Sequence, residues 1–142
     1  MISASAVAER LGGLGRRKSA VTDLALAEAV RDGLAMSALD RLIADEVVSE
    51  QEVEAHFIPR RTLYARRQKG TLSREQSDLV VRLARIQAMA DEVFGDRRKT
   101  HGWLRDKNGA LASQTPLSLL DTEEGGRLVE TVLGRIAHGI FE

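Results

Sequence analysis

The sequence predicts an all-α protein, and three observations support this fold class. Apolar residues recur at steps of three and four along most of the chain, capping motifs precede several of these runs, and no stretch alternates with a period of two. The chain has 142 residues, of which 43% are hydrophobic and 30% charged. Chains near this size bury roughly 68% of their unfolded surface when they fold, so a hydrophobic core is feasible without disulfides or metals.

The first part of the chain is expected to form a flexible segment followed by two helices. Residues 1–20, which include the glycine-rich run 11–15, are interpreted as the flexible segment. Thr22 is a good N-cap for a helix that carries Leu24, Ala27 and Val30 at helical spacing. A second helix follows, and its apolar face is formed by Met36, Leu39, Leu42, Ile43 and Val47.

Two short helices are then predicted to meet at a tight turn. Ser49 and Glu52 form a capping box that opens the first helix, over residues 49–56. The second is expected over residues 59–69, because proline is tolerated in a first helical turn and disfavours helix in the residue before it. Leu63 lies between polar neighbours and is interpreted as the core contact of this second helix.

The longest helix is predicted next. Ser73 and Gln76 form a second capping box, and the apolar positions that follow are Leu79, Leu83, Ile86, Ala90 and Val93. We expect a boundary between two helical parts near Gly95. The expected domains are therefore a domain with these two short helices over residues 21–95 and a second small helical domain over residues 96–142.

The second domain is expected to contain shorter elements and one final helix. Asp96 is a candidate cap for a short helix, Asn108 begins a tight turn, and Pro116 starts a turn of helix. Thr122 caps the last helix, which ends at Gly139. Its apolar side is predicted to consist of Leu128, Val129, Val132, Leu133 and Ile136.

Charge is unevenly distributed, although 21 basic and 21 acidic residues give a net charge of zero. Residues 40–54 contain six acidic residues and a single arginine, whereas residues 60–74 contain six basic residues and no acid. A basic second helix after a tight turn is typical of helix-turn-helix DNA recognition. The candidate DNA-binding residues are Arg60, Arg61, Thr62, Tyr64, Arg66, Arg67 and Lys69. Alternatively, these arginines form a solvated face or pair with the acidic segment.

Enzymatic chemistry finds little support in the sequence. The chain has no cysteine, which excludes a disulfide framework, a thiol nucleophile and Cys-ligated metal sites. The three histidines, His56, His101 and His138, are far apart, so we expect no metal site, no cofactor and no enzyme activity. No apolar run approaches the about 20 residues of a membrane span, and no secretion signal is evident. We therefore expect a soluble cytoplasmic protein.

Two sets of motifs resemble the Xre/MbcA/ParS antitoxins. The first set runs through the basic helix, as Arg61-Thr62-Leu63-Tyr64-Ala65-Arg66-Arg67 and the residues that follow it to Arg85. The second set resembles the toxin-binding domain of that family and includes Trp103-Leu104, Thr115-Pro116-Leu117, Leu119-Leu120 and Leu133-Gly134-Arg135-Ile136-Ala137-His138-Gly139. The resemblance extends from about Leu24 to the end of the chain.

This resemblance implies a type II antitoxin that binds a toxin of the RES fold, which consumes NAD. It also implies a homodimer that binds a palindromic operator and represses its own operon. The implied toxin-binding residues are Trp103, Leu104, Pro116, Leu120, Arg135, His138, Gly139, Ile140, Phe141 and Glu142. The apolar tail with its terminal carboxylates is expected to occupy the mouth of the toxin's active site, so that inhibition needs no catalysis by the antitoxin.

The sequence departs from the family pattern at two positions. Pro59 stands where a serine-like cap is common, which leaves the basic helix without a side-chain cap, and Ala35 stands where proline is common. A second interpretation of function remains open. It is a stand-alone helix-turn-helix regulator whose C-terminal domain serves dimerisation or binds a small ligand. A neighbouring gene for a RES-type protein would favour the antitoxin, and an isolated gene would favour the regulator.

Overall fold

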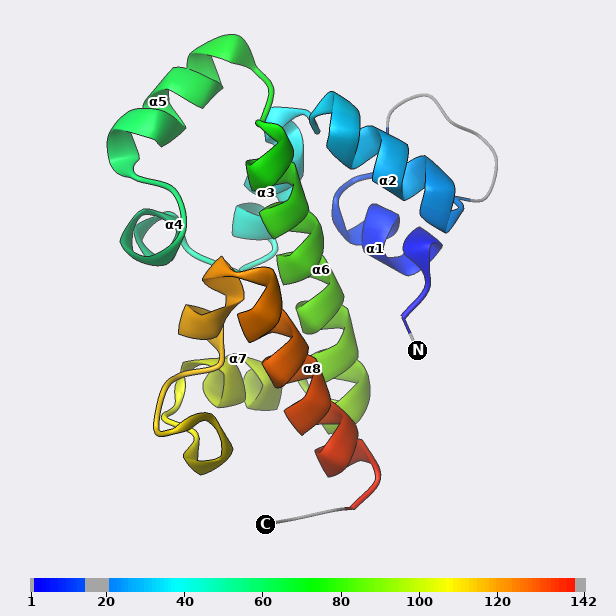
Figure 1. Ribbon diagram of the computed structural model, residues 1–142, viewed down its shortest axis with the longest axis vertical. Helices are drawn as coiled ribbons and strands as arrows, with labels where there is room; N and C mark the ends of the chain where they lie inside the picture. The colour runs from blue at the N-terminus through cyan, green and yellow to red at the C-terminus, as the bar shows by residue number, and fades with distance from the viewer. Residues whose placement is uncertain (1, 15–20, 140–142) are drawn as a thin grey trace. The chain divides into compact units, whose positions relative to one another are not determined.

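The computed structural model describes residues 2–14 and 21–139, and these residues form α-helices and two short 3-10 helices without a β-strand (Figure 1). The predicted all-α fold is confirmed. Contacts between residues divide the chain into two compact units, residues 1–84 and 85–142. The sequence analysis placed the boundary near Gly95, whereas this division falls inside a long helix. None of the helices in the described part of the chain has both the length and the apolar character needed to span a bilayer.

In the described residues of the N-terminal unit, five helices are followed by the start of a sixth. Their bounds are α1 (Ala4–Arg10), α2 (Asp23–Asp32), α3 (Met36–Ala44), α4 (Glu50–His56), α5 (Arg60–Lys69) and α6 (Arg74–Phe94). The largest side chains in its core that are almost fully inaccessible to solvent are Val7, Leu39, Leu42, Val48, Val53, Val80 and Leu83. These residues come from α1, α3, α4, α6 and the segment after α3, so the core of this unit is shared by elements far apart in the sequence.

The start of the chain differs from the sequence-based expectation. Residues 4–10 form α1 where a flexible segment was expected, with Ser3 as its N-cap and with Val7 fully buried. The buried residues of α2 are Ala25 and Leu26, whereas Leu24, which was expected on the apolar face, is 68% exposed. Spacing alone identified α2 as a helix, but packing against α1 decides which of its faces is inside.

A backbone contact connects the α2–α3 loop to the loop after α5. The amide of Met36 donates to the carbonyl of Gly70 at 2.9 Å, and the amide of Leu72 donates to the carbonyl of Leu34 at 2.8 Å. The amide of Leu34 in turn donates to the buried Ser77 hydroxyl at 2.8 Å. These bonds hold the C-terminal end of α5 in place, because Gly70 is the residue at which that helix ends.

The loop contact also explains the glycine that ends α2. Gly33 has a φ of 92°, in the region that favours glycine. A Cβ atom at this position would lie 2.6 Å from the carbonyl oxygen of Leu72. The two loops can therefore approach this closely only because residue 33 has no side chain.

The C-terminal unit contains the rest of α6, α7 (Arg97–Arg105), the 3-10 helices η1 (Gly109–Leu111) and η2 (Leu117–Asp121), and α8 (Glu123–Ala137). The predicted caps Asp96 and Thr122 are confirmed, since each accepts a hydrogen bond from a backbone amide of the following helix. Asn108, which was expected to begin a tight turn, accepts from the amide of Ala110 in η1. α8 packs on η2 and η1. The core of this unit consists mainly of Ile86, Ala90, Leu104, Leu111, Leu117, Leu120, Val129 and Leu133.

The first turn of α8 lies in very close contact with η2. Gly125 is buried, and a Cβ atom there would be 1.8 Å from the carbonyl oxygen of Leu119. No side chain fits at that distance, so glycine at this position is what allows α8 to begin against η2. By contrast, a Cβ atom at Gly134, later in the same helix, would have no neighbouring atom within 4 Å.

Candidate DNA interface and candidate partner-binding helix

The predicted helix-turn-helix pair corresponds to α4 and α5. Both hydrogen bonds of the Ser49–Glu52 capping box are present, because each side chain accepts from the backbone amide of the other residue. α4 ends at His56, before Pro59. As the sequence predicted, Pro59 precedes α5 without forming a side-chain cap, and Gly70 ends α5 in the left-handed conformation. The turn is held by three buried side chains, Val53, Ile58 and Leu63, because each of them is at most 2% exposed.

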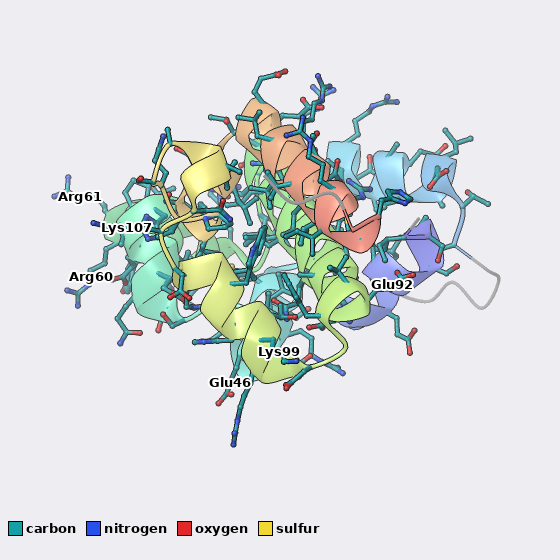
Figure 2. The ribbon with its side chains drawn as sticks, turned by 90° about the horizontal axis from the view of Figure 1, so that it is seen from below. Glu46, Arg60, Arg61, Glu92, Lys99 and Lys107 are labelled. Carbon is teal, nitrogen blue, oxygen red and sulfur yellow. The ribbon has the colours of Figure 1, made fainter. Side chains whose placement is uncertain are left out.

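α5 presents most of its surface to solvent. Leu63 is its only buried residue, as the sequence analysis expected. Tyr64 is 67% exposed, and the other exposed residues of α5 that were predicted to bind DNA are Arg60, Arg61, Thr62 and Lys69. Figure 2 shows the side chains of Arg60 and Arg61 extending outward from the helix. These side chains can reach base edges or phosphates without any rearrangement of the helix.

Arg67 differs from the other cations of α5. One terminal nitrogen of its guanidinium bonds to Asp40 Oδ1 and the other to Glu50 Oε1, each at 2.6 Å. The hydrogen bond to Asp40 and the further bond and charge of Glu50 raise the pKa of Arg67 above its ordinary value, against a smaller effect of burial. The side chain therefore remains charged throughout the pH range of ordinary binding assays.

The other basic side chains of α5 have no such partners. Arg60, Arg61, Arg66 and Lys69 form no ion pair with another described residue. The sequence had left open that the arginines of the basic helix pair with the acidic segment 40–54. Among the cations of α5, this pairing is found for Arg67. A sequence signal for this was available, because Arg67 lies four residues after Leu63 and so shares the face of the buried anchor.

α8 is the second candidate site, because one of its faces carries a row of exposed side chains. Leu128, Thr131, Arg135 and His138 follow one another at steps of three, four and three, and all four are exposed. We call these four residues the α8 stripe. Leu128 is 55% exposed, so its predicted place on the apolar inner side was wrong. Of these four residues, only Arg135 and His138 are among the toxin-binding residues expected from the sequence.

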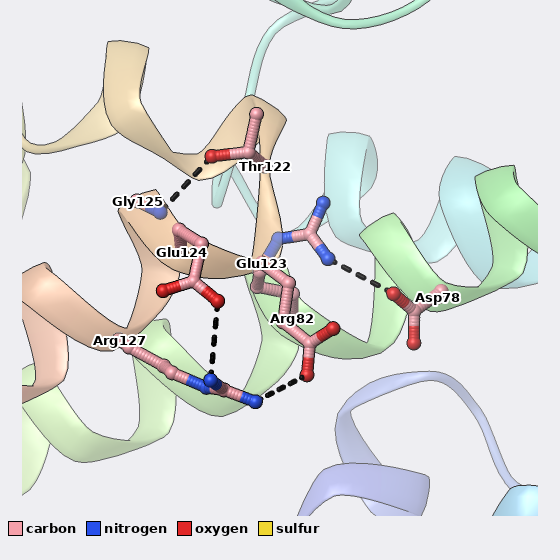
Figure 3. Close-up of polar contacts among 7 residues, drawn as sticks. All are labelled: Asp78, Arg82, Thr122, Glu123, Glu124, Gly125 and Arg127. Carbon is pink, nitrogen blue, oxygen red and sulfur yellow. Dashed lines mark hydrogen bonds and ion pairs between the residues drawn. The ribbon is translucent and has the colours of Figure 1, made fainter.

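The start of α8 is well ordered by local polar contacts (Figure 3). The Thr122 hydroxyl accepts a hydrogen bond from the amide of Gly125 at 3.0 Å. Arg127 bonds to Glu123 and to Glu124, at 3.1 Å in each case. Figure 3 also draws the pair between Arg82 and Asp78 within α6. All of these ion-pair partners are largely exposed except Arg82, so they order the surface more than they stabilise the fold.

Several predicted toxin-binding residues lie inside the C-terminal unit. Leu104 and Leu120 are at most 2% exposed, and Pro116 is also buried. These three side chains are therefore not on the surface of the unit in this structure, and their contact with a toxin stays a prediction. Trp103 is half-buried, and its ring lies 5.5 Å from that of Phe94, centroid to centroid. Gly139 is exposed, whereas Ile140, Phe141 and Glu142 lie outside the described residues.

The histidines do not form a site together. His56, His101 and His138 are all exposed. Within residues 2–14 and 21–139, no group of three or more metal-ligating side chains is close enough to hold an ion.

Comparison with known proteins matches the two parts of the chain to two family models. Residues 25–85 match the antitoxin Xre-like helix-turn-helix domain, and residues 89–139 match the antitoxin Xre/MbcA/ParS C-terminal toxin-binding domain. An Antitoxin Xre of Pseudomonas putida is 34% identical over 119 residues, which cover 83% of this chain and 74% of that protein. The chain belongs to the Xre antitoxin family.

Other relatives of this Xre-family chain are similar over comparable lengths. An Antitoxin Xre of Yersinia enterocolitica is 30% identical over 82% of this chain and 80% of its own length. A Sphingobium protein named Prs ADP-ribosylating antitoxin is 30% identical over 79% of this chain and 77% of its own length. The helix-turn-helix model includes α4 and α5, and the toxin-binding model includes α7 to α8. The two domains therefore follow each other in the order expected from the sequence.

Proposed function

We propose that this Xre-family antitoxin binds and inhibits a toxin with the RES fold, which consumes NAD, and that it represses its own operon through α4 and α5. The observation that carries the proposal is that the toxin-binding domain presents the α8 stripe, while α5 of the helix-turn-helix domain presents a basic, exposed face. Two exposed surfaces on separate units allow one chain to serve a protein partner and DNA.

The α8 stripe has the composition of a protein-binding surface. Leu128 supplies an exposed apolar side chain, and Arg135 supplies a guanidinium on the same helix face. Arginines and buried apolar groups often account for much of the binding energy at protein interfaces. We therefore place the main toxin contact on this stripe, with Gly139 and the residues after it as its continuation.

Inhibition would be steric. In this proposal Ile140, Phe141 and Glu142 enter the mouth of the toxin's active site and exclude the dinucleotide. The antitoxin then needs no catalytic residue and no cofactor. Removal of residues 139–142 should leave complex formation through the α8 stripe partly intact but should abolish protection of cells that express the toxin. Full protection by the shortened chain would contradict the steric proposal.

The central experiment is co-expression of this chain with the product of the neighbouring gene. We expect a stable complex on affinity purification and preserved cellular NAD, with NAD lost when this chain is omitted. A complex without any effect on NAD would leave an antitoxin of another toxin class. If neither complex nor NAD effect is found, a stand-alone helix-turn-helix regulator becomes the better account.

The stripe can be tested with two matched leucines. Leu128→Ser replaces the exposed leucine of α8, and Leu24→Ser replaces a leucine of similar exposure in the other unit. We expect Leu128→Ser to weaken toxin binding by at least tenfold, the effect of about 1.4 kcal/mol, and Leu24→Ser to leave it unchanged. Equal effects of the two variants would remove α8 from the interface.

DNA binding is proposed to involve a homodimer. Helix-turn-helix dimers bind two half-sites whose symmetry mirrors that of the protein, so a palindromic operator is expected near the promoter of the gene. Sedimentation of the purified chain tests the dimer. A duplex that spans its own promoter, compared with a shuffled duplex, tests the operator. Equal affinity for the two duplexes would argue against autoregulation.

A further inference from the structure

Arg67 is the cation of α5 whose surroundings differ most from those of a phosphate-binding residue. Its two terminal nitrogens bond to Asp40 on α3 and to Glu50 at the start of α4, both at 2.6 Å. The side chain is 32% exposed. A single guanidinium therefore joins α5 to the two helices that precede it in the chain.

The charge of this group opposes contact with DNA. Two carboxylates and one guanidinium within hydrogen-bonding distance carry one net negative charge, because Asp40 and Glu50 outweigh Arg67. Binding to DNA depends on positive charge that replaces the counterions of the phosphates. Arg67 in this arrangement offers no net attraction to a phosphate, in contrast to Arg60 and Arg61, which form no ion pair with any described residue.

The position of Arg67 on α5 explains why such a connection is useful. Leu63 is the only buried residue of the helix, so apart from the backbone bonds at Gly70 a single side chain attaches α5 to its unit. Arg67 lies one turn further along on the same face, so it supplies a second point of attachment. Two points on one face determine the direction in which the side chains on the opposite face project.

We infer that Arg67 is a positioning residue of the DNA interface: its bonds to Asp40 and Glu50 set the orientation of α5, and it does not itself contact phosphate. This inference rests on the proposed binding of DNA by α5. It also divides the basic helix, because Arg61 and Lys69 lie on the side of α5 away from Leu63, whereas Arg67 faces α3 and α4. It revises the sequence-based grouping, in which Arg67 was a DNA contact equivalent to its neighbours.

The test compares salt dependence and sequence discrimination in two variants. The first combines Arg67→Met with Asp40→Asn, which breaks the connection and leaves the net charge unchanged. The second, Arg61→Met, removes an exposed cation. Affinity is measured over a series of salt concentrations, for the duplex spanning the chain's own promoter and for a shuffled duplex. Arg67→Lys is included because lysine keeps the charge but cannot bond two carboxylates through a planar fork.

For Arg67→Met with Asp40→Asn, we expect the slope of log K against log salt to stay at the wild-type value. The preference for the promoter duplex should fall by about tenfold, the size of one lost base contact. Arg67→Lys should lie between this variant and the wild type. Arg61→Met should reduce the slope by about 0.9, the effect of one lost phosphate contact. A slope reduced to the same extent in the Arg67 variant would overturn the inference, and so would unchanged discrimination with an unchanged slope.

Hydrogen exchange separates this inference from the proposed function. Amide exchange in α5 is measured on the free proteins, so it does not depend on DNA. We expect α5 amides to exchange at least several-fold faster in the Arg67 variants and α8 amides to be unaffected. If the wild type binds neither duplex, the proposed function fails, and the exchange data alone then decide whether Arg67 holds α5. Unchanged exchange in α5 would reject the positioning role.

Discussion

The two helices that carry the candidate sites, α5 and α8, are attached to their units in different ways. α5 buries one side chain, Leu63, and is held otherwise by Arg67 and by the backbone bonds at Gly70. α8 buries five residues, Gly125, Gly126, Val129, Val132 and Leu133. A helix that must enter a DNA groove keeps most of its surface outside, so few contacts determine its orientation.

Because α5 and α8 are attached so differently, the two sites should respond differently to substitution. α8 has one exposed side and one buried side, and its position is set by packing that cannot be changed without disturbing the core. The orientation of α5 depends on a few polar bonds whose loss leaves the rest of the unit folded. Changes in the attachment of α8 should therefore act on stability, whereas changes in the attachment of α5 should act chiefly on specificity.

Gly125→Ala should give the largest effect. Its Cβ atom would lie 1.8 Å from the carbonyl oxygen of Leu119, so α8 and η2 must separate. We expect a loss of about 3 kcal/mol or more in the free energy of unfolding of the C-terminal unit. Urea titration monitored by the fluorescence of Trp103, the only tryptophan of the chain, measures it.

The matched control for this change is Gly134→Ala in the same helix. A Cβ atom there meets no atom within 4 Å, so the higher helix propensity of alanine should stabilise the unit by up to about 1 kcal/mol. If both alanine variants unfolded at the same urea concentration, the close contact between α8 and η2 would not be what holds this helix.

Leu63→Ala tests the single buried anchor of α5. Removing a fully buried leucine costs about 2 to 4 kcal/mol, and here the loss should be concentrated in α4 and α5. Hydrogen exchange of those helices and thermal unfolding followed by circular dichroism measure it. Leu24→Ala, at a 68% exposed position, should change stability by less than about 0.5 kcal/mol. Equal costs would show that α5 has other anchors.

Ser77→Ala tests the buried bond behind the end of α5. The variant leaves the amide of Leu34 without its partner at 2.8 Å, and an unsatisfied buried donor costs about 1 to 3 kcal/mol. The exchange rate of the Leu34 amide and the midpoint of thermal unfolding report the effect. Ser37→Ala, at an exposed position of α3, is the control and should leave both quantities nearly unchanged. If Ser77→Ala changed neither the exchange rate nor the unfolding midpoint, the loop contact would not depend on this bond.

The helix caps should give the smallest effects and should be similar in the two units. Ser49→Ala removes the cap of α4, and Thr122→Ala removes the cap of α8. Each should cost about 1 kcal/mol, because one backbone donor loses its side-chain acceptor. Hydrogen exchange in α4 measures the effect of Ser49→Ala, and urea unfolding followed by Trp103 fluorescence measures the effect of Thr122→Ala. A much larger cost in one unit would show that its cap also supports tertiary packing.

Much of the local structure could be predicted from the sequence. The two capping boxes, at Ser49 and Ser73, are present with both of their bonds, and α5 ends at Gly70 as expected. The burial of Leu63 was also predicted. The capping boxes and the end of α5 depend on residues at most four apart, whose geometry is the same in any protein that forms the helix.

The candidate sites could be predicted only in part. On α8, Arg135 and His138 were named from the sequence as candidate contacts, and both are exposed. Leu128 was expected inside, because helical spacing does not say which apolar residue faces outward, and Thr131 was not named. Leu104 and Leu120 were named as contacts although they are buried. A motif shared with a family marks a residue as important without distinguishing contact from support.

The sequence by itself determined that this protein is helical, where most of its helices begin and end, and which helix is basic. Only the tertiary structure decided that Arg67 bonds to Asp40, 27 residues away, and that Ser77 accepts from Leu34, 43 residues away. It also decided that Leu128 lies outside and Leu26 inside. The physical reason is distance along the chain: capping and periodicity act within one or two turns, whereas burial and long-range ion pairs exist only after separate helices have packed together.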